Sequence, residues 1–362
     1  MKQAVFAPDP SRARAAVERC PMHAVTPLRP LEIDGVTVRI KDEGARFGIG
    51  SFKALGGVYA IMRSLCDLHE VRTGVRPSIE ALFEHDRRAL HAEVDFVCAS
   101  AGNHGIAVAT GAALLGARAR VHLSDEVPED FAARLRARGA EVVRSGADYQ
   151  QSLDAALADA AGGGGRLIAD TAWDGYVDVP AGIMEGYTMV GEELVDAFTA
   201  TGDWPSDVYL QAGVGGLAGA LTWHIRHRWA VQPRIVIVEP EAAPCLAVSA
   251  RTGTVATVAG PASNMGRLDC KSASPLAVHA LRDADVDYLA VSDASAEVAV
   301  QRLAGLGVST TPSGAAGFAA WLQERVRTTA AGGSPLVIVS EAGIGDGATP
   351  DGVGGGGTRA GA

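Results

Sequence analysis

The chain has 362 residues, of which 48% are hydrophobic and 20% are charged, and its formal net charge is −10. A chain of this length is expected to form one large domain or two closely packed ones, and its composition excludes a disordered protein. The negative charge argues against nucleic acid and anionic membranes as partners, because no basic stripe is available to neutralise phosphates.

The cysteines and the chain start predict the compartment. Five cysteines are scattered without paired spacing, which indicates neither a disulfide framework nor a metal site. The segment MKQAVFAPDPSRARAAVERC lacks the apolar stretch of a signal peptide, and no apolar run approaches the length of a membrane span. We therefore expect an enzyme or binding protein of the reducing cytoplasm.

Strand and helix patterns alternate along the chain. Residues 31–41, LEIDGVTVRIK, alternate in polarity around Asp34-Gly35, which predicts a β-hairpin. A helix is predicted from Lys53 through Leu65, followed by a charged connection over residues 76–88. Further strands are predicted at residues 96–100, 119–124, 141–144, 166–170, 207–212, 234–241 and 336–340, and further helices at 106–115, 129–138, 149–160, 183–199 and 218–228.

This alternation predicts an α/β fold. Strands that alternate with helices at this spacing are typical of parallel sheets. We predict two open parallel-sheet α/β domains with a cleft between them. Residues 1–57 and 163–351 would form the large domain, residues 58–162 the small domain, and the Gly-rich tail 352–362 would be disordered.

Lys53 lies among glycines and apolar residues in SFKALGG, with no other Lys or Arg between Arg46 and Arg63. An ammonium held against apolar groups has its charged form disfavoured, so its pKa would fall and the amine would become available as a nucleophile or base. The alternative is a lysine at a helix start whose ammonium simply reaches solvent.

The stretch Gly213–Leu217, GVGGL, follows a predicted strand and opens a predicted helix. Glycines let backbone N–H groups approach an anion while the helix N-terminus supplies partial positive charge, which suits a phosphate monoester. A dinucleotide site is disfavoured because the first strand-to-helix turn has no Gly-rich fingerprint. The alternative is a turn that needs glycine only for its connection.

The stretch Ser100–Gly105, SAGNHG, lies where a predicted strand ends and a helix begins. Its N–H groups can hold a carboxylate, and the Asn103 amide can donate to a phenolate oxygen. The alternative is a helix cap in which Asn103 satisfies the backbone alone. His104 could act as a base, but a histidine beside a helix start is more often structural, so we do not assign it a catalytic role.

Asp170 ends the apolar strand 166–170 at the expected edge of the cleft. A carboxylate there would have a raised pKa and could serve as a general base or acid. The alternative is that it caps the loop. Asp174, which precedes Gly175, is interpreted as a turn residue.

Together these stretches resemble the fold type II pyridoxal 5′-phosphate (PLP) enzymes, the group of tryptophan synthase β and threonine dehydratase, and within it the diaminopropionate ammonia-lyases. The resemblance covers residues 26–343. Its most specific pieces are RFGIGSFKALGGVYA, DTAWDGYVDVPAGIMEGY and NMGRLDCKSASPLA.

The resemblance implies PLP in the cleft between the domains. By position, Lys53 resembles the Schiff-base lysine and Asp170 the aspartate implied in proton abstraction from an L-substrate. The hydroxyl of Ser340 would meet the pyridine nitrogen and leave it largely unprotonated, and Asn103 would contact the phenolic oxygen. The implied cofactor contacts are Phe52, Asn103, Gly213, Val214, Gly215, Gly216, Leu217 and Ser340, and the implied substrate contacts are Ser100, Ala101, Gly102 and His104.

The implied reaction is α,β-elimination from a β-substituted amino acid such as 2,3-diaminopropionate, giving a 2-oxo acid and ammonia, in a homodimer. Two departures bear on the substrate. Ala101 stands where the lyases carry an aspartate implied in abstraction from the D-substrate, and Pro312-Ser313-Gly314 stands where they carry an acidic residue before Ser-Gly. A serine or threonine dehydratase, a β-replacement enzyme and a non-catalytic amino-acid-binding protein remain as alternatives.

Overall fold

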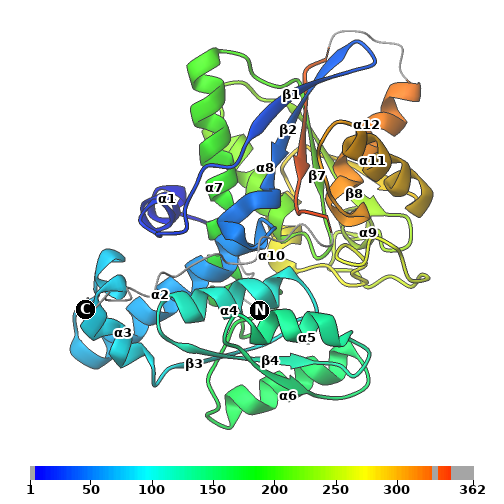
Figure 1. Ribbon diagram of the computed structural model, residues 1–362. Coiled ribbons are helices and arrows are strands. Elements are labelled where there is room, and N and C mark those ends of the chain that lie inside the picture. Colours follow the sequence, from blue (N-terminus) through cyan, green and yellow to red (C-terminus); the bar gives the residue numbers. More distant parts are fainter. Residues whose placement is uncertain (1–4, 328–332, 344–362) are drawn as a thin grey trace, which may run out of the picture.

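The computed structural model describes residues 5–327 and 333–343, and the predicted tail 352–362 lies outside them. The larger of its two sheets has the strand order β1-β2-β10-β7-β8-β9 (Figure 1). All neighbouring strands in it are parallel except β1 and β2, which form the predicted hairpin with Asp34 and Gly35 at φ 51° and 78°. Its strands are β1 Leu28–Ile33, β2 Val36–Asp42, β7 Asp207–Gln211, β8 Arg234–Pro240, β9 Asp287–Val291 and β10 Pro335–Val339.

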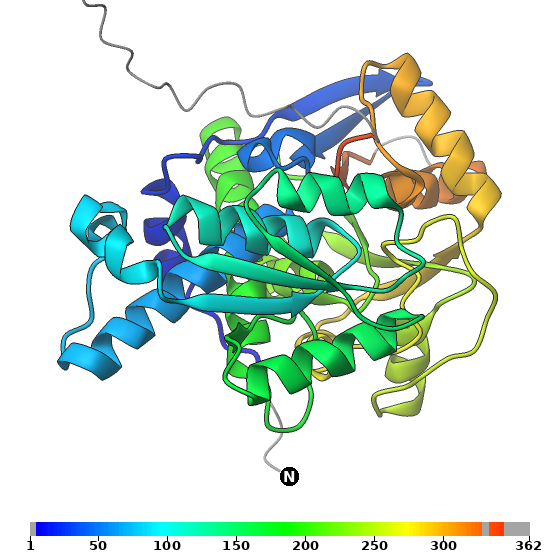
Figure 2. The same ribbon diagram turned by 60° about the horizontal axis from the view of Figure 1, so that its bottom comes forward.

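The smaller sheet is parallel throughout and has the order β5-β4-β3-β6. In Figure 2 it comes forward with its helices. Its strands are β3 Asp95–Ala99, β4 Arg118–Leu123, β5 Glu141–Arg144 and β6 Arg166–Leu167.

Strand β6 departs from the sequence prediction, which assigned residues 166–170 to the large domain. Its backbone pairs with β3, so it belongs to the smaller sheet. The reason is that α6 carries the chain from β5, at one edge of the smaller sheet, to the opposite edge, where β6 pairs with β3. The periodicity of the sequence does not indicate which strand β6 pairs with. The division into two domains remains a prediction, and the pairing of β6 puts residues 166–167 with the smaller sheet.

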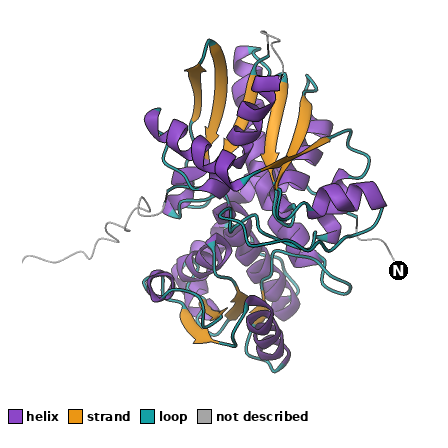
Figure 3. Cartoon of the chain, turned by 90° about the vertical axis from the view of Figure 1, so that its right-hand side faces the viewer, coloured by secondary structure: helices purple, strands orange, loops and turns teal. Residues whose placement is uncertain are grey.

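Helices flank the strands, as Figure 3 shows, and the predicted α/β class with parallel sheets is confirmed. The predicted helices are present with shifted ends, and the charged connection 76–88 contains a 3-10 turn and a short helix. The helices are α1 Pro10–Glu18, η1 Glu43–Gly48, α2 Lys53–Thr73, η2 Glu80–Phe83, α3 His85–His91, α4 Asn103–Leu114, α5 Glu129–Arg136, α6 Tyr149–Ala161, α7 Asp178–Thr201, α8 Gly216–Arg228, α9 Cys245–Thr252, α10 Pro275–Leu281, α11 Asp293–Gly305 and α12 Pro312–Arg327.

Helix α2 joins the two halves because glycines let it approach a helix on each side. A Cβ atom on Gly56 would lie 2.5 Å from the Tyr187 ring of α7, and one on Gly57 would lie 2.6 Å from Ala107 of α4. Real side chains do not pack this closely, so these positions admit only glycine without movement of α7 or α4. The helix therefore holds Lys53, its first residue, between the two sheets.

A buried cluster of charges fixes the segment that leads to Lys53. Arg46 donates to Glu43 and Glu193, and Lys41 pairs with Glu193 at 2.5 Å. The Lys41 ammonium also donates to the carbonyl of Thr26 at 2.8 Å. Two cations and two carboxylates thus satisfy one another, which is the condition under which buried charges are tolerated.

An apolar core continues from one sheet to the other, since one cluster of buried residues includes Phe96 and Val121 of the smaller sheet as well as Ile235 and Leu336 of the larger. Within residues 5–327 and 333–343, no helix combines the length and apolar character needed to cross a bilayer.

Candidate active site

Lys53 and Asp170 form the centre of the candidate site. The Lys53 ammonium lies 2.5 Å from a carboxylate oxygen of Asp170, although 117 residues separate them along the chain. Their side chains are 24% and 20% exposed, so the pair faces an opening. The ammonium also lies 5.4 Å from the centre of the Phe52 ring and 5.8 Å from that of Tyr187.

The charges of this pair differ from the sequence prediction. Burial alone would lower the pKa of Lys53, but the attraction of Asp170 outweighs it and the pKa is raised. Burial alone would likewise raise the pKa of Asp170, but the charge of Lys53 overrides it and the pKa is lowered. The prediction considered the apolar neighbours along the chain, and it could not include a partner from the other sheet. With both groups charged, the pair can hold a proton on Nζ.

The SAGNHG turn is held by Ser100 rather than by Asn103. The Ser100 hydroxyl accepts hydrogen bonds from the backbone N–H groups of Gly102 at 3.3 Å and Gly105 at 3.0 Å. Asn103 begins α4, makes no capping bond, and donates its side-chain N–H to Glu341 across the site. The structure therefore disagrees with the alternative in which Asn103 only caps its helix.

The two remaining side chains of this turn face different surroundings. His104 is buried, and its Nε2 donates to the backbone carbonyl of Ile168 at 2.8 Å. Burial lowers the pKa of His104, so the ring is neutral. It anchors the start of α4 to the segment before Asp170. Ala101 is exposed at the tip of the turn and contributes only a methyl group.

The glycine loop after β7 forms a close-packed cradle. A Cβ on Gly213 would lie 2.9 Å from the Cys270 sulfur, and one on Gly215, whose φ is +99°, would lie 2.7 Å from Ala277. Helix α8 begins at Gly216 with no side-chain cap on its N-terminus. Such a terminus suits an anion, because its N–H groups and the helix dipole both favour negative charge.

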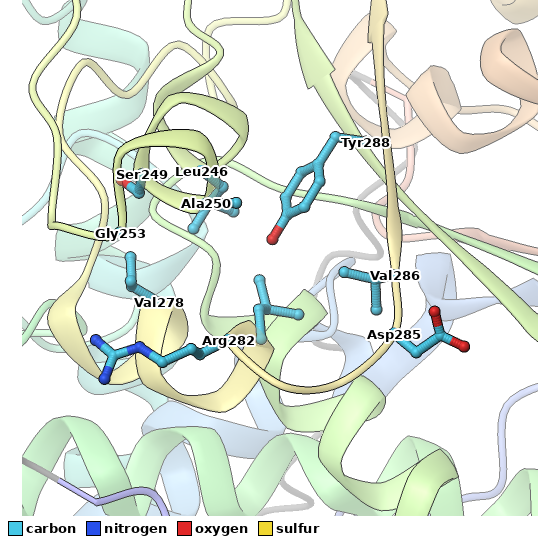
Figure 4. A pocket seen from close by; sticks show the side chains of 10 residues that line it. Leu246, Ser249, Ala250, Gly253, Val278, Arg282, Asp285, Val286 and Tyr288 are labelled. Atoms are coloured by element: carbon cyan, nitrogen blue, oxygen red, sulfur yellow. The ribbon is translucent and has the colours of Figure 1, made fainter.

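The rest of the loop is fixed from behind. The Val214 carbonyl accepts from the Ser274 N–H at 2.9 Å, and Leu217 is 5% exposed. Leu246 of α9 lies within 3.0 Å of the position that a Cβ on Gly215 would take. Behind Leu246 is a cavity of about 260 Å³ (Figure 4), lined by Leu246, Ser249, Ala250, Gly253, Val278, Leu281, Arg282, Asp285, Val286 and Tyr288. It contains no residue of the predicted site.

Ser340 joins two parts of the site. Its hydroxyl lies 3.0 Å from the side-chain nitrogen of Gln211, at the end of the neighbouring strand β7. Its carbonyl accepts from the Phe52 N–H at 3.1 Å, which ties the Lys53 turn to the end of β10. The Phe52 ring packs edge-on against the Tyr187 ring, and the centres of the two rings are 4.9 Å apart.

Sequence reasoning missed a buried carboxyl beside Asn103. Glu341 is 4% exposed, accepts hydrogen bonds from Asn103 and Thr311, and pairs with Arg267 at 2.9 Å. Burial raises the pKa of Glu341, and Arg267 opposes that shift. An acid directly after the buried strand 336–340 was the signal that could have revealed it.

These residues fit pyridoxal phosphate. The uncapped start of α8 and its glycines suit the phosphate, Asn103 and Ser340 offer polar groups to the ring, and Lys53 offers an amine to the aldehyde. The fit rests on the glycine cradle, which a side chain at Gly213 or Gly215 would fill. Among the residues that the structure describes, no group of His, Cys, Asp and Glu could hold a metal ion.

Comparison with known proteins gives one family. The family described as "Pyridoxal-phosphate dependent enzyme" matches residues 20–341. Diaminopropionate ammonia-lyase of Escherichia coli K12 is 32% identical over 269 residues, which are 74% of this chain and 66% of the relative. A probable D-serine dehydratase of Burkholderia thailandensis is 29% identical over 59% of this chain and 48% of that protein. The chain thus aligns with slightly less than two thirds of the lyase.

Solved structures agree in fold. The E. coli lyase in complex with an aminoacrylate-PLP azomethine reaction intermediate has a TM-score of 0.78 and 26% identity, and covers 94% of this chain and 92% of its own. The same lyase in complex with D-serine has a TM-score of 0.79 and 27% identity, with the same coverage. Maize serine racemase, with a TM-score of 0.76 and 22% identity over 94% of this chain and 95% of its own, shares the fold.

Proposed function

The chain belongs to the pyridoxal-phosphate dependent enzymes, and on this basis we propose that it is a lyase that eliminates ammonia from a 2,3-diaminopropionate-like amino acid. The products are a 2-oxo acid and ammonia. The observation that carries the proposal is the Lys53–Asp170 pair, with its 2.5 Å contact beside the glycine cradle. Similarity to the ammonia-lyases supports the type of reaction.

The cofactor is pyridoxal phosphate, which when bound supplies an electron sink for the charge that develops at the substrate Cα. The start of α8 with Gly213, Gly215 and Gly216 would hold its phosphate, Lys53 its aldehyde carbon, Asn103 its phenolic oxygen and Ser340 its ring nitrogen. Phe52 and Tyr187 limit the volume around Lys53 and exclude water from one side of it.

Asp170 is the proposed base. While Lys53 is a cation, its charge holds the pKa of Asp170 low. Once Nζ is engaged as a neutral group, burial acts on the carboxylate alone and the pKa of Asp170 rises, which makes it a better acceptor for the Cα proton. The proton that Asp170 accepts from Cα can pass across the 2.5 Å contact to the Lys53 amine, once that amine is free, and from there to the leaving β-amino group. The pair thus moves one proton from Cα to the leaving group.

The N–H groups of the SAGNHG turn are the proposed site for the substrate carboxylate. Those of Gly102 and Gly105 are occupied by Ser100, so the remaining backbone groups of Ala101, Asn103 and His104 are the candidates. The exposed methyl group of Ala101 cannot accept a proton. We therefore propose that the L-substrate is used through Asp170 and that the D-substrate is disfavoured.

A hydroxy-amino-acid dehydratase is the second candidate. Ala101 favours it, because SAGNHG resembles the dehydratases, and relatives that are probable D-serine dehydratases support it. A β-replacement enzyme would share the same cofactor contacts and differ only in what reacts after elimination.

A substrate panel tests the proposal. The purified PLP-loaded protein is incubated with L- and D-2,3-diaminopropionate, L- and D-serine and L-threonine, and 2-oxo acid and ammonia are measured. We expect L-diaminopropionate to give both products with the highest kcat/KM. Preference for a hydroxy amino acid would favour the dehydratase. If a nucleophile is added to the reaction and the product is a new amino acid instead of a 2-oxo acid, β-replacement is favoured. Product from none of these substrates would refute the lyase proposal.

We also propose a homodimer, by analogy with the family, and a cytoplasmic location. All five cysteines are free thiols, which is consistent with a reducing compartment. Light scattering of the purified protein tests the dimer, and fractionation of cells that produce it tests the location.

A further inference from the structure

Four arginines line a cavity between α1, α2 and the segment that leads into η2. This cavity differs from the one in Figure 4, has a volume of about 260 Å³ and contains no residue of the candidate active site. Its cations are Arg12 and Arg19 of α1, Arg63 of α2, and Arg76. Among the described residues that line it, Glu80 is the one carboxylate, and it pairs with Arg19. Positive charge therefore predominates on the wall of this cavity.

Arg63 differs from the other three because it has no hydrogen-bonded carboxylate. Arg12 donates to both carboxylate oxygens of Glu185, at 3.0 and 2.7 Å, and Arg76 donates to two carboxylates of α2, at 2.6 and 2.8 Å. The carboxylate oxygen nearest to Arg63 belongs to Glu185 and lies 3.7 Å away, which is too far for a hydrogen bond. Within the part of the chain that the structure describes, Arg63 makes no hydrogen bond.

Glu185 has no free lone pair to offer to Arg63. Its side chain is 3% exposed, and its two oxygens accept four hydrogen bonds: two from Arg12, one from the Tyr59 hydroxyl and one from the Asp9 N–H. A carboxylate has about four lone-pair sites, so these bonds fill it. The protein therefore leaves the donors of Arg63 to another acceptor.

The Arg63 guanidinium is nevertheless held in place. A Cβ atom on Gly182 of α7 would lie 2.7 Å from Nη1 of Arg63, so the guanidinium lies directly on the backbone of that helix. Its Cζ atom also lies 5.9 Å from the centre of the Tyr59 ring. The Arg63 side chain is 27% exposed. The cavity wall thus presents a fixed cation whose N–H groups are available to a ligand.

The size and the remaining walls of the cavity limit what can bind there. Ala15, Ala16, Cys66, Pro77 and Ile79 add apolar surface between the arginines. A volume of about 260 Å³ equals that of roughly nine liquid waters at about 30 Å³ each, so an enclosed ligand has at most about ten non-hydrogen atoms. A nucleotide is too large, whereas a small organic acid fits.

We propose that this cavity binds a small organic carboxylate with a short apolar chain and no ammonium group, and that the carboxylate lies on Arg63. A guanidinium presents paired N–H groups that match the two oxygens of a carboxylate. The apolar chain contacts the alanines of α1 and Ile79, which inorganic phosphate would leave in contact with water. An ammonium group on the ligand would be repelled by the four guanidinium groups. Because the cavity shares no residue with the candidate active site, this binding and the proposed reaction can be tested separately.

A series of probes of nearly equal shape tests the ligand class. Titration calorimetry measures the binding of 3,3-dimethylbutanoate to the full-length, PLP-loaded protein. Trimethylglycine replaces one carbon of this probe by a quaternary ammonium, 3,3-dimethylbutanamide removes its negative charge, and inorganic phosphate removes its apolar part. None of these molecules has an amine that could react with PLP. We expect saturable binding of 3,3-dimethylbutanoate and at least about tenfold weaker binding of the other three.

A matched pair of arginine variants tests the place of binding. Arg63→Met keeps an unbranched apolar side chain and removes the cation, so the affinity for 3,3-dimethylbutanoate should fall about tenfold or more, as for the loss of a charge-assisted hydrogen bond. Arg87→Met is the control, because Arg87 has a similarly distant carboxylate, Glu84 at 3.8 Å, but does not line the cavity. Its affinity should equal that of the wild type.

A second variant fills the cavity without changing a charge. Ala15 is an exposed residue of α1 on the cavity wall, so Ala15→Leu should prevent binding even though all four arginines remain. If Arg63→Met does not fold, Ala15→Leu and the probe series decide.

Three results would overturn the proposal. They are the absence of saturable binding of 3,3-dimethylbutanoate to the wild type below about 10 mM, equal affinity for trimethylglycine, and equal affinity of Arg63→Met or Ala15→Leu and the wild type. An equal loss in Arg63→Met and Arg87→Met would also contradict it, since it would show a general effect of net charge. A protein that binds the carboxylate but converts no amino acid would contradict the proposed reaction and not this site.

Discussion

Lys41 and Lys53 each contact a carboxylate at 2.5 Å, yet their surroundings differ. Lys41 and Glu193 are both 2% exposed in their side chains, and the ammonium has a second acceptor in a backbone carbonyl. Lys53 and Asp170 are 24% and 20% exposed, and aromatic rings replace the second acceptor. The first pair is closed and the second is open to a ligand.

The difference teaches how to separate a structural ion pair from a reactive one. In a closed pair both charges are surrounded by further hydrogen-bond donors and acceptors of the protein, so neither charge is accessible to a ligand. In an open pair whose cation lies against apolar rings, the amine can exchange the carboxylate for an electrophilic carbon or another negative charge of a ligand. The same 2.5 Å contact is thus expected to support the fold in one place and chemistry in the other.

The largest expected effect tests the open pair. Replacing Lys53 with alanine removes the amine that would hold the cofactor, so kcat/KM should fall by ~10⁴-fold or more. The visible absorbance band of the bound cofactor should disappear, while the urea midpoint of the cofactor-free protein should fall less than it does after the matched change at the closed pair. A variant that keeps both the band and full turnover would contradict the assignment.

The matched change at the closed pair should act on stability instead. Lys41→Met leaves Glu193 with Arg46 as its remaining cation and should lower the free energy of unfolding by about 3 kcal/mol. The measurement is urea unfolding of both lysine variants without cofactor. If Lys41→Met and Lys53→Ala lost equal stability, the distinction between closed and open pairs would fail.

Asp170→Asn sharpens the role of the open pair. The amide cannot accept the Cα proton, so kcat should fall by ~10²-fold. The informative measurement is the rate of solvent-deuterium exchange at the substrate Cα, which should slow in parallel with turnover. An unchanged exchange rate would assign the proton transfer to Lys53 alone.

The smallest expected effect concerns a buried carboxyl that is held by two backbone N–H groups rather than by a cation. Glu239 accepts from Leu246 and Ala247 at 2.7 and 2.8 Å, and burial raises its pKa to about 7. Because the folded-state pKa lies above the unfolded one, the folded protein favours the neutral form, and stability is lost as the pH rises through about 7.

Between about pH 6 and about pH 8 this loss should amount to about 1 kcal/mol, and Glu239→Gln should remove it. Thermal unfolding of the two proteins across this range measures the difference between their slopes. Parallel slopes would show that Glu239 does not titrate in this range.

The candidate site shows which of its parts could be inferred from the sequence. Lys53, Asp170, the SAGNHG turn and the GVGGL loop were identified because each is a local pattern, a residue type at the end of a strand or the start of a helix. Gln211 and Glu341 were not identified, although Glu341, like Asp170, is an acid at the end of a predicted buried strand. Their importance lies in contacts with Ser340 and Asn103 that connect different strands and helices.

The same division holds for the fold. Alternating strands and helices and the Asp34-Gly35 hairpin follow from short-range periodicity and turn chemistry, and these predictions agree with the structure. The helices α1 and α9–α12 and strand β9 were not predicted.

By itself, then, the sequence determined the α/β class, the family and the residues that flank the site, because all of these are written in local patterns of the chain. Only the tertiary structure decided that β6 pairs with β3, that Lys53 meets Asp170 and is charged, and that Gln211 contacts Ser340. The physical reason is that pKa values, hydrogen-bond directions and strand partners depend on groups far apart in the chain, which become neighbours only when the sheets assemble.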